Sequence, residues 1–127
     1  LEAAAALGAD VAFCTVGGRA RVAGIGERVE PLPFVDAIYT LVTPPVGCPT
    51  AAIYRRWDEL GGPSGPSGND LEPAAIDVVP ELVPWRDDLA RTTGLTPRLA
   101  GSGSTWFVPG AHPGPGRVLA RTVAADR

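Results

Sequence analysis

Small residues and hydroxyl groups gather in one stretch of the chain, Gly101-Ser102-Gly103-Ser104. Glycine accepts positive φ and lets a ligand or another backbone come close. Consecutive N–H groups in such a turn can form a concavity that binds anions, and the serines add hydroxyls. Apolar Leu99-Ala100 precedes the stretch and β-prone Thr105-Trp106-Phe107 follows it. An ordinary tight turn between strands is therefore the simpler interpretation, and phosphate binding needs support from the rest of the chain.

A second candidate is the carboxylate of Asp10, within Gly8-Ala9-Asp10-Val11. It follows an alanine-rich segment, residues 1–7, that we expect to be helical and to end at Gly8. A carboxylate at this place can act as a general base or orient a hydroxyl group. It can equally cap or end a junction between a helix and a strand, and the local sequence alone favours that structural role.

The composition excludes several classes of function. No apolar run of the 127 residues comes near the roughly 18–20 residues of a membrane span, so no membrane partner is expected. The net charge of −3 and the scattered basic residues argue against a nucleic-acid partner. All 11 basic residues are arginine, so no lysine of this chain can hold a phosphate. Cys14 and Cys48, with a single histidine, predict buried thiols rather than a disulfide or a zinc site.

Hydrophobic patterning predicts the strands that carry these groups. Alternation over 19–25 and 27–32 indicates a hairpin that follows a turn at Gly17-Gly18, and residues 9–13 read as a tight connecting segment. The near-continuous apolar run of 36–42 suits a central strand. Shorter strands are expected at 98–100 and 105–108. The last element, 117–123, is expected to be a strand, although a helix would serve its apolar residues equally well.

Helices are expected over 50–60, 71–79 and 81–93. Thr50 could cap the first and Asn69 or Asp70 the second, while Gly94 closes the third. A surface loop rich in proline and glycine, 61–68, separates the first two helices. Large aromatic side chains usually fill cores, so the three tryptophans, Trp57, Trp85 and Trp106, are expected there. The order of elements predicts an α+β sandwich with one mostly antiparallel sheet.

The motifs occur in the order found in one enzyme family. Leu7-Gly8-Ala9-Asp10-Val11, then Gly17-Gly18-Arg19-Ala20 and Gly24-Ile25-Gly26-Glu27, resembles the middle of 4-diphosphocytidyl-2-C-methyl-D-erythritol kinases. These belong to the superfamily of galactokinase, homoserine kinase, mevalonate kinase and phosphomevalonate kinase. The pattern continues through Thr43-Pro44-Pro45, Pro49-Thr50 with Tyr54, Gly68-Asn69-Asp70-Leu71-Glu72, and Leu99 to Ser104 with Phe107. The resemblance covers essentially the whole chain, and the Asn-Asp-Leu-Glu element points to this kinase among its relatives.

The resemblance implies the superfamily's C-terminal kinase domain, a ferredoxin-like sandwich, over residues 33–127. Residues 1–32 would be the tail of the N-terminal catalytic and ATP-binding domain, with its hairpin. The implied reaction moves the ATP γ-phosphoryl group to a hydroxyl of a cytidine-diphosphate-linked methylerythritol, in the non-mevalonate isoprenoid pathway. Mg²⁺ accompanies ATP in reactions of this type, and no ligand residue for it is identified. The family is cytoplasmic, and its partners are small molecules.

The resemblance also implies roles for particular residues. Asp10 matches the aspartate beside the accepting hydroxyl, as base or orienting group. Tyr54 matches an aromatic that stacks on the cytosine base, with Thr50 nearby, although a place in the core is an equally open interpretation of Tyr54. The turn of Gly101, Ser102, Gly103 and Ser104 resembles a motif that lies next to the phosphate-binding loop and would support the phosphate site.

The chain also departs from the family. The family's catalytic lysine and its glycine- and serine-rich phosphate loop are not in this sequence, Ala12 stands where proline is usual, and the connection at 109–116 is short. We therefore expect a C-terminal portion of the enzyme that is inactive alone. Two alternatives stay open: another kinase of the superfamily, of homoserine or mevalonate type, or a non-catalytic α+β ligand-binding module.

Overall fold

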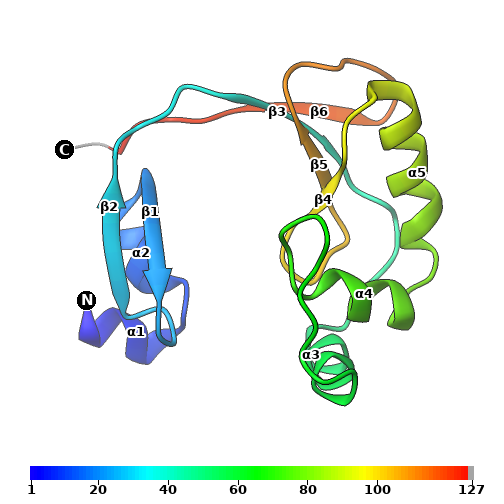
Figure 1. Cartoon of the computed structure of the whole chain (residues 1–127). Helices are drawn as coiled ribbons and strands as arrows, with labels where there is room; N and C mark the ends of the chain where they lie inside the picture. The colour runs from blue at the N-terminus through cyan, green and yellow to red at the C-terminus, as the bar shows by residue number, and fades with distance from the viewer. Residues whose placement is uncertain (126–127) are drawn as a thin grey trace. The chain divides into compact units, whose positions relative to one another are not determined.

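The computed structural model describes residues 1–125 and divides into two compact units. The first holds Leu1–Ala37 together with the stretch that begins at Arg121, and the second holds Ile38–Ala120 (Figure 1). The expected division lay after residue 32. The compact units divide after Ala37, and the chain returns to the first unit at its end. The boundary between the family's two domains stays a prediction.

The first unit packs two short helices with a hairpin. Its helices are α1 (Glu2–Leu7) and α2 (Val11–Val16), and its strands are β1 (Arg19–Ala23) and β2 (Arg28–Leu32). The strands pair antiparallel in their own two-stranded sheet, and α2 contacts both α1 and β2. The helix that ends before Gly8 and the hairpin are confirmed.

Helix α2 corrects the expectation of a tight connecting segment at residues 9–13. Its sequence, VAFCTV, is rich in β-branched residues with weak helix propensity, so no local signal announced it. The helix forms in its tertiary context: Ala12 is fully buried, and Gly17 ends the helix with φ 68°.

The second unit is built on a four-stranded sheet of order β4-β5-β3-β6. Its strands are β3 (Ile38–Val42), β4 (Arg98–Leu99), β5 (Trp106–Pro109) and β6 (Arg117–Arg121). Strand β5 runs antiparallel to both β3 and β4, and β3 is central, as its apolar run predicted. The last element is a strand, which decides between the two interpretations of 117–123. The α+β class with antiparallel sheets is confirmed.

Three helices complete this unit, α3 (Thr50–Glu59), α4 (Glu72–Val78) and α5 (Leu82–Thr93), close to the expected spans. The core contains Val42, Trp106 and Val108 from the sheet with Ile53 and Leu82 from the helices. The buried indole of Trp106 donates to the Leu82 carbonyl at 3.1 Å, so its polar atom is satisfied.

The expectation that all three tryptophans fill the core holds only in part. Trp106 is fully buried and Trp57 is half-buried against the core. Trp85, by contrast, is 38 % exposed. An aromatic residue in a helical pattern therefore does not by itself indicate burial.

Two capping expectations are wrong. Pro49 is the N-cap of α3, and no side chain caps that helix, so Thr50 has another partner. Leu71 is the N-cap of α4, and Asn69 Oδ1 instead accepts the Leu71 N–H at 3.0 Å. Asp70 Oδ1 accepts the Gly65 N–H at 3.1 Å, within the loop. These polar side chains organise the segments before the helices rather than the helix ends.

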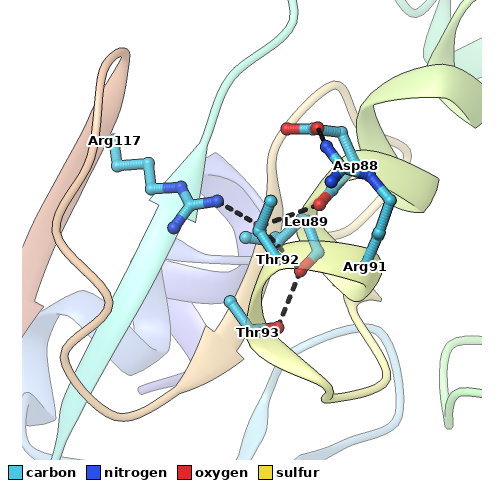
Figure 2. A network of polar contacts seen from close by, with 6 residues as sticks. All are labelled: Asp88, Leu89, Arg91, Thr92, Thr93 and Arg117. Carbon is cyan, nitrogen blue, oxygen red and sulfur yellow. Dashed lines mark hydrogen bonds and ion pairs between the residues drawn. The ribbon is translucent and has the colours of Figure 1, made fainter.

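The C-terminal end of α5 is tied to β6, an edge strand of the sheet (Figure 2). The Arg117 guanidinium donates to the Thr92 hydroxyl, which donates in turn to the Asp88 carbonyl at 2.8 Å. Arg91 pairs with the Asp88 carboxylate at 2.6 Å. The helix ends at Gly94 with φ 70°, as expected. These contacts hold the edge strand against the helix.

Both cysteines are free thiols. Cys14 is exposed, which contradicts the expectation of a buried side chain, whereas Cys48 is half-buried and burial raises the pKa of its thiol. Across residues 1–125, no helix has the length and apolar character that crossing a membrane requires.

Candidate functional site

The glycine- and serine-containing turn at 101–104 connects β4 to β5. Two internal hydrogen bonds close it: the Ala100 N–H donates to the Thr105 carbonyl at 2.8 Å, and the Gly103 N–H donates to the Ala100 carbonyl at 3.0 Å. Gly101 and Gly103 have φ of 57° and 102°, the region that favours glycine. The backbone conformation of the turn therefore favours glycine at both positions, whether or not a ligand binds there.

Gly103 also allows a close approach. A Cβ atom at this position would lie 2.9 Å from Cys48 Sγ and 3.4 Å from Leu99 Cδ1. A side chain at 103 would therefore require Cys48 or the turn to shift.

Hydroxyl groups bind the turn to two other segments. Thr50 Oγ1, at the first residue of α3, lies 3.0 Å from Ser102 Oγ. Ser104 Oγ donates to the Pro44 carbonyl at 3.0 Å. The structure thus brings together Thr50 and the turn, which the sequence nominated for substrate binding and for phosphate support.

Asn69, in the segment before α4, also binds the turn. Its Nδ2 donates to the Leu99 carbonyl at 2.8 Å and to the Gly101 carbonyl at 2.7 Å. Its Oδ1 accepts the Leu71 N–H. The side-chain amide therefore joins the start of α4 to the end of β4 and the beginning of the turn.

An open cleft of about 530 Å³ lies beside the turn. Its lining comes from α3, the segment before α4, β4, the turn and β5, and includes Tyr54, Asn69, Asp70, Arg98, Gly101 and Phe107. Tyr54 is 52 % exposed, so the interpretation that places its ring in the core is wrong. Tyr54 is thus an exposed lining residue of the cleft.

Arg98 brings positive charge to the cleft, although it is not among the residues predicted for the site. Its Nη2 donates to the Gly68 carbonyl at 2.6 Å, and its Cα pairs with that of Phe107 across β4 and β5. It also borders a second hollow on the sheet, with Tyr39 and Leu41. Arg98 could have been predicted from the sequence because it lies three residues before Gly101.

Asp10 belongs to the first unit, whereas Thr50, Tyr54 and the turn belong to the second. Asp10 is the N-cap of α2, and its backbone carbonyl accepts the Cys14 N–H at 3.0 Å. Its exposed carboxylate makes no capping hydrogen bond. The structural alternative for Asp10, that it caps or ends the junction after the first helix, is therefore supported by its N-cap position but not by a side-chain hydrogen bond.

The hairpin turn holds the backbone next to Asp10. Gly26 is buried with φ 110°, and a Cβ there would lie 1.9 Å from the Ala9 carbonyl oxygen. The Gly24-Ile25-Gly26 segment and the Gly8-Ala9-Asp10 segment are thus packed on one another. This packing explains why the two motifs, separate in the sequence, occur together.

No group of three or more His, Cys, Asp or Glu side chains that could hold a metal ion occurs within residues 1–125. We assign no metal ligand in this part of the chain.

Comparison with known proteins decides the family. No protein-family model matches the chain. The 4-diphosphocytidyl-2-C-methyl-D-erythritol kinase of Cereibacter sphaeroides is 37 % identical over 147 aligned positions, which cover 98 % of this chain and 53 % of the relative. The enzyme of that name from Desulfitobacterium hafniense is 36 % identical, over 82 % of this chain and 43 % of its own length. The chain belongs to this kinase family.

A solved structure of 4-(cytidine 5'-diphospho)-2C-methyl-D-erythritol kinase shares the fold of this family member. It matches with a TM-score of 0.65 and 32 % identity, over 81 % of this chain and 44 % of that one. The chain spans about half the length of the curated relatives it matches. The alignment of 147 positions is longer than the chain, so the Cereibacter kinase has residues within the matched region that this chain lacks. The family resemblance is confirmed, and the roles of individual residues remain predictions.

Proposed function

We propose that this chain forms part of an ATP-dependent kinase that phosphorylates a hydroxyl of 4-diphosphocytidyl-2-C-methyl-D-erythritol. The observation that carries the proposal is the cleft of the second unit, where Tyr54 borders the same hollow as Gly101. The names of the relatives point to a cytidyl-linked substrate and make the homoserine- and mevalonate-type alternatives less well supported.

Tyr54 supplies a flat aromatic surface for the cytosine base in this proposal. Its ring is half-exposed at the cleft, and stacking of a base on an aromatic side chain contributes about 1–3 kcal/mol. Thr50 lies one helical turn before Tyr54 on α3, so both side chains share a face of that helix. The pair therefore offers a stacking surface with a hydroxyl group beside it.

The turn at 101–104 supports the phosphate-binding part of the site. Its glycines adopt positive φ, and hydrogen bonds with Asn69, Thr50 and Pro44 fix it to three other segments. Phosphoryl transfer depends mainly on positioning and on stabilisation of charge, so a rigid wall beside the phosphates is a useful contribution.

Asp10 accepts or orients the proton of the attacking hydroxyl in this proposal. Support comes from its exposed carboxylate, which makes no capping hydrogen bond, and from the packing of Gly26 against Ala9, which fixes the backbone beside it. A general base must lie within hydrogen-bond reach of the proton that it abstracts.

ATP is the expected phosphoryl donor, and the enzyme is expected in the cytoplasm. Mg²⁺, when bound, neutralises charge on the ATP phosphates, and residues 1–125 present no cluster to hold it. The sequence has no lysine, so any lysine that contacts the phosphates must lie outside these 127 residues. We therefore expect no kinase activity from this chain alone.

A hybrid enzyme tests the function. This chain would replace the matched region of the Cereibacter kinase, and phosphorylation of the cytidyl-linked substrate, homoserine and mevalonate would be measured. We expect turnover of the cytidyl substrate alone. Preference for homoserine or mevalonate would select the alternative kinase, and a folded but inactive hybrid would favour a non-catalytic binding module.

A further inference from the structure

We infer that Asn69 is the positioning residue of the turn at 101–104, fixing the Gly101–Ser102 peptide for the kinase reaction. Its importance for catalysis rests on the function proposed above. We call the two hydrogen bonds from Asn69 Nδ2 to the Leu99 and Gly101 carbonyls the clamp. The clamp can be tested in this chain without any substrate.

The side-chain amide of Asn69 has no free N–H donor with which to orient a ligand. An Asn amide has two N–H donors, and both are used, to the Leu99 carbonyl at 2.8 Å and the Gly101 carbonyl at 2.7 Å. Its oxygen accepts the Leu71 N–H at 3.0 Å. Asn69 therefore acts through the turn rather than on a substrate directly.

The contact with the Gly101 carbonyl sets the direction of the next N–H group. The Gly101–Ser102 peptide is trans, so its carbonyl and the Ser102 N–H point in opposite directions. Because the carbonyl points toward Asn69, the Ser102 N–H points away from it. Within residues 1–125, that N–H donates no hydrogen bond. Asn69 thus fixes the orientation of the Ser102 N–H, which points away from the Asn69 side chain.

The other contacts of the turn engage neither polar group of the Gly101–Ser102 peptide, and the Gly103–Ala100 backbone hydrogen bond only spans it. The Thr50–Ser102 and Ser104–Pro44 hydrogen bonds hold side chains, which rotate about χ1 without turning the peptide. Gly101 itself has no side chain to limit its φ and ψ. Without the Asn69 donors, this peptide is restrained only through the backbone hydrogen bonds that close the turn on either side of it.

Two substitutions separate the donors from the rest of the side chain. Asn69→Asp keeps the size and the oxygen that accepts the Leu71 N–H, but places a second oxygen against the two carbonyl oxygens. Asn69→Ala removes all three hydrogen bonds. Asp87→Asn, on the exposed face of α5, is the matched control because Asp87 pairs only with its neighbour Arg86 among the described residues.

Amide hydrogen exchange in this chain tests the clamp. We expect the Ala100 and Gly103 N–H groups, which close the turn, to exchange at least about tenfold faster in Asn69→Asp and Asn69→Ala. The Val108 N–H, in the sheet, should keep its rate, and the control should match wild type throughout. At lower pH, exchange of the Ala100 and Gly103 N–H groups in Asn69→Asp should become slower relative to wild type at the same pH, because a protonated carboxyl regains one donor. Unchanged exchange at both turn positions would overturn the clamp.

Kinetics in the hybrid kinase test the catalytic consequence. We expect Asn69→Asp to lower kcat by about ten- to a hundredfold, since a misplacement of about 1 Å can cost 10²-fold, with little change in the KM of the cytidyl substrate. A loss confined to KM would contradict the positioning role. A folded wild-type hybrid without activity would overturn the proposed function and this catalytic role together, whereas the exchange experiment would still decide the clamp by itself.

Discussion

Thr50 Oγ1 and Ser102 Oγ lie 3.0 Å apart, although 52 residues separate them in the chain. The contact joins the first residue of α3 to the turn between β4 and β5. One residue was nominated for substrate binding and the other for phosphate support. Their contact makes the two predicted groups neighbours in the structure.

A double-mutant cycle measures this contact. Thr50→Val and Ser102→Ala each remove one hydroxyl group, and we expect a coupling of about 0.5–1 kcal/mol in the free energy of unfolding, the usual net value of a hydrogen bond. Urea unfolding of the two single variants and the double variant gives the value. Strictly additive effects would show that the two hydroxyls do not interact in solution.

Gly103→Ala should destabilise the second unit by about 1–3 kcal/mol, because φ at 103 is positive and a Cβ would lie 2.9 Å from Cys48 Sγ. Gly47→Ala is the control, since a Cβ at 47 meets no atom within 4 Å and its φ lies outside the left-handed region. Chemical denaturation should show a loss for the first variant and almost none for the second. Equal effects of the two substitutions would mean that the turn has another conformation.

Tyr54→Ala should weaken binding of cytidine diphosphate to the chain by about 1–3 kcal/mol, while Tyr54→Phe should keep most of the affinity, because stacking needs the ring and not the hydroxyl. Titration followed by NMR would also report shifts at Gly101 and Arg98, which border the same cleft. If Tyr54→Ala binds as well as wild type, the base does not stack on this ring.

The Asp36–Arg121 ion pair should make the stability of the first unit depend on pH. Arg121 Nε and Nη2 donate to the two Asp36 oxygens at 2.8 and 2.6 Å, and these hydrogen bonds lower the pKa of the Asp36 carboxyl. A lowered pKa in the folded state adds stability above the ordinary value of about 3.9, and that stability is lost as the pH falls through the lower folded value.

Thermal unfolding of wild type and Asp36→Asn tests the pair. The difference in Tm should be largest near neutral pH and should shrink as the pH falls below about 4. Glu30→Gln, on the exposed part of β2 in the same unit, is the matched control. Both side chains of the pair are largely exposed, so the effect should be small and should weaken with salt. A difference that grows toward low pH would contradict the assignment.

Most of the fold follows from local patterns in the sequence. The apolar run of β3, the glycines around the hairpin and Gly94 after α5 each carry a signal that depends on near neighbours in the chain. Helix α2 could not be predicted in this way, because its β-branched residues disfavour a helix and the burial of Ala12 decides the outcome.

The candidate site was predictable by residue type but not by contact. Glycine and serine in 101–104 indicated a turn that could support a phosphate. The expected helix caps of Thr50 and Asn69 were wrong because both side chains bind the distant turn instead. Such partners lie 52 and 32 residues away, and local sequence contains no information on them.

The most direct measurement of the central claim is the kinetics of Asp10→Asn in the hybrid kinase. The claim is that this chain supplies a catalytic carboxylate to phosphoryl transfer onto a cytidyl-linked alcohol. Removal of the base should lower kcat by about 10²- to 10⁴-fold and leave the KM of the substrate nearly unchanged. Turnover close to that of the unsubstituted hybrid would contradict the claim.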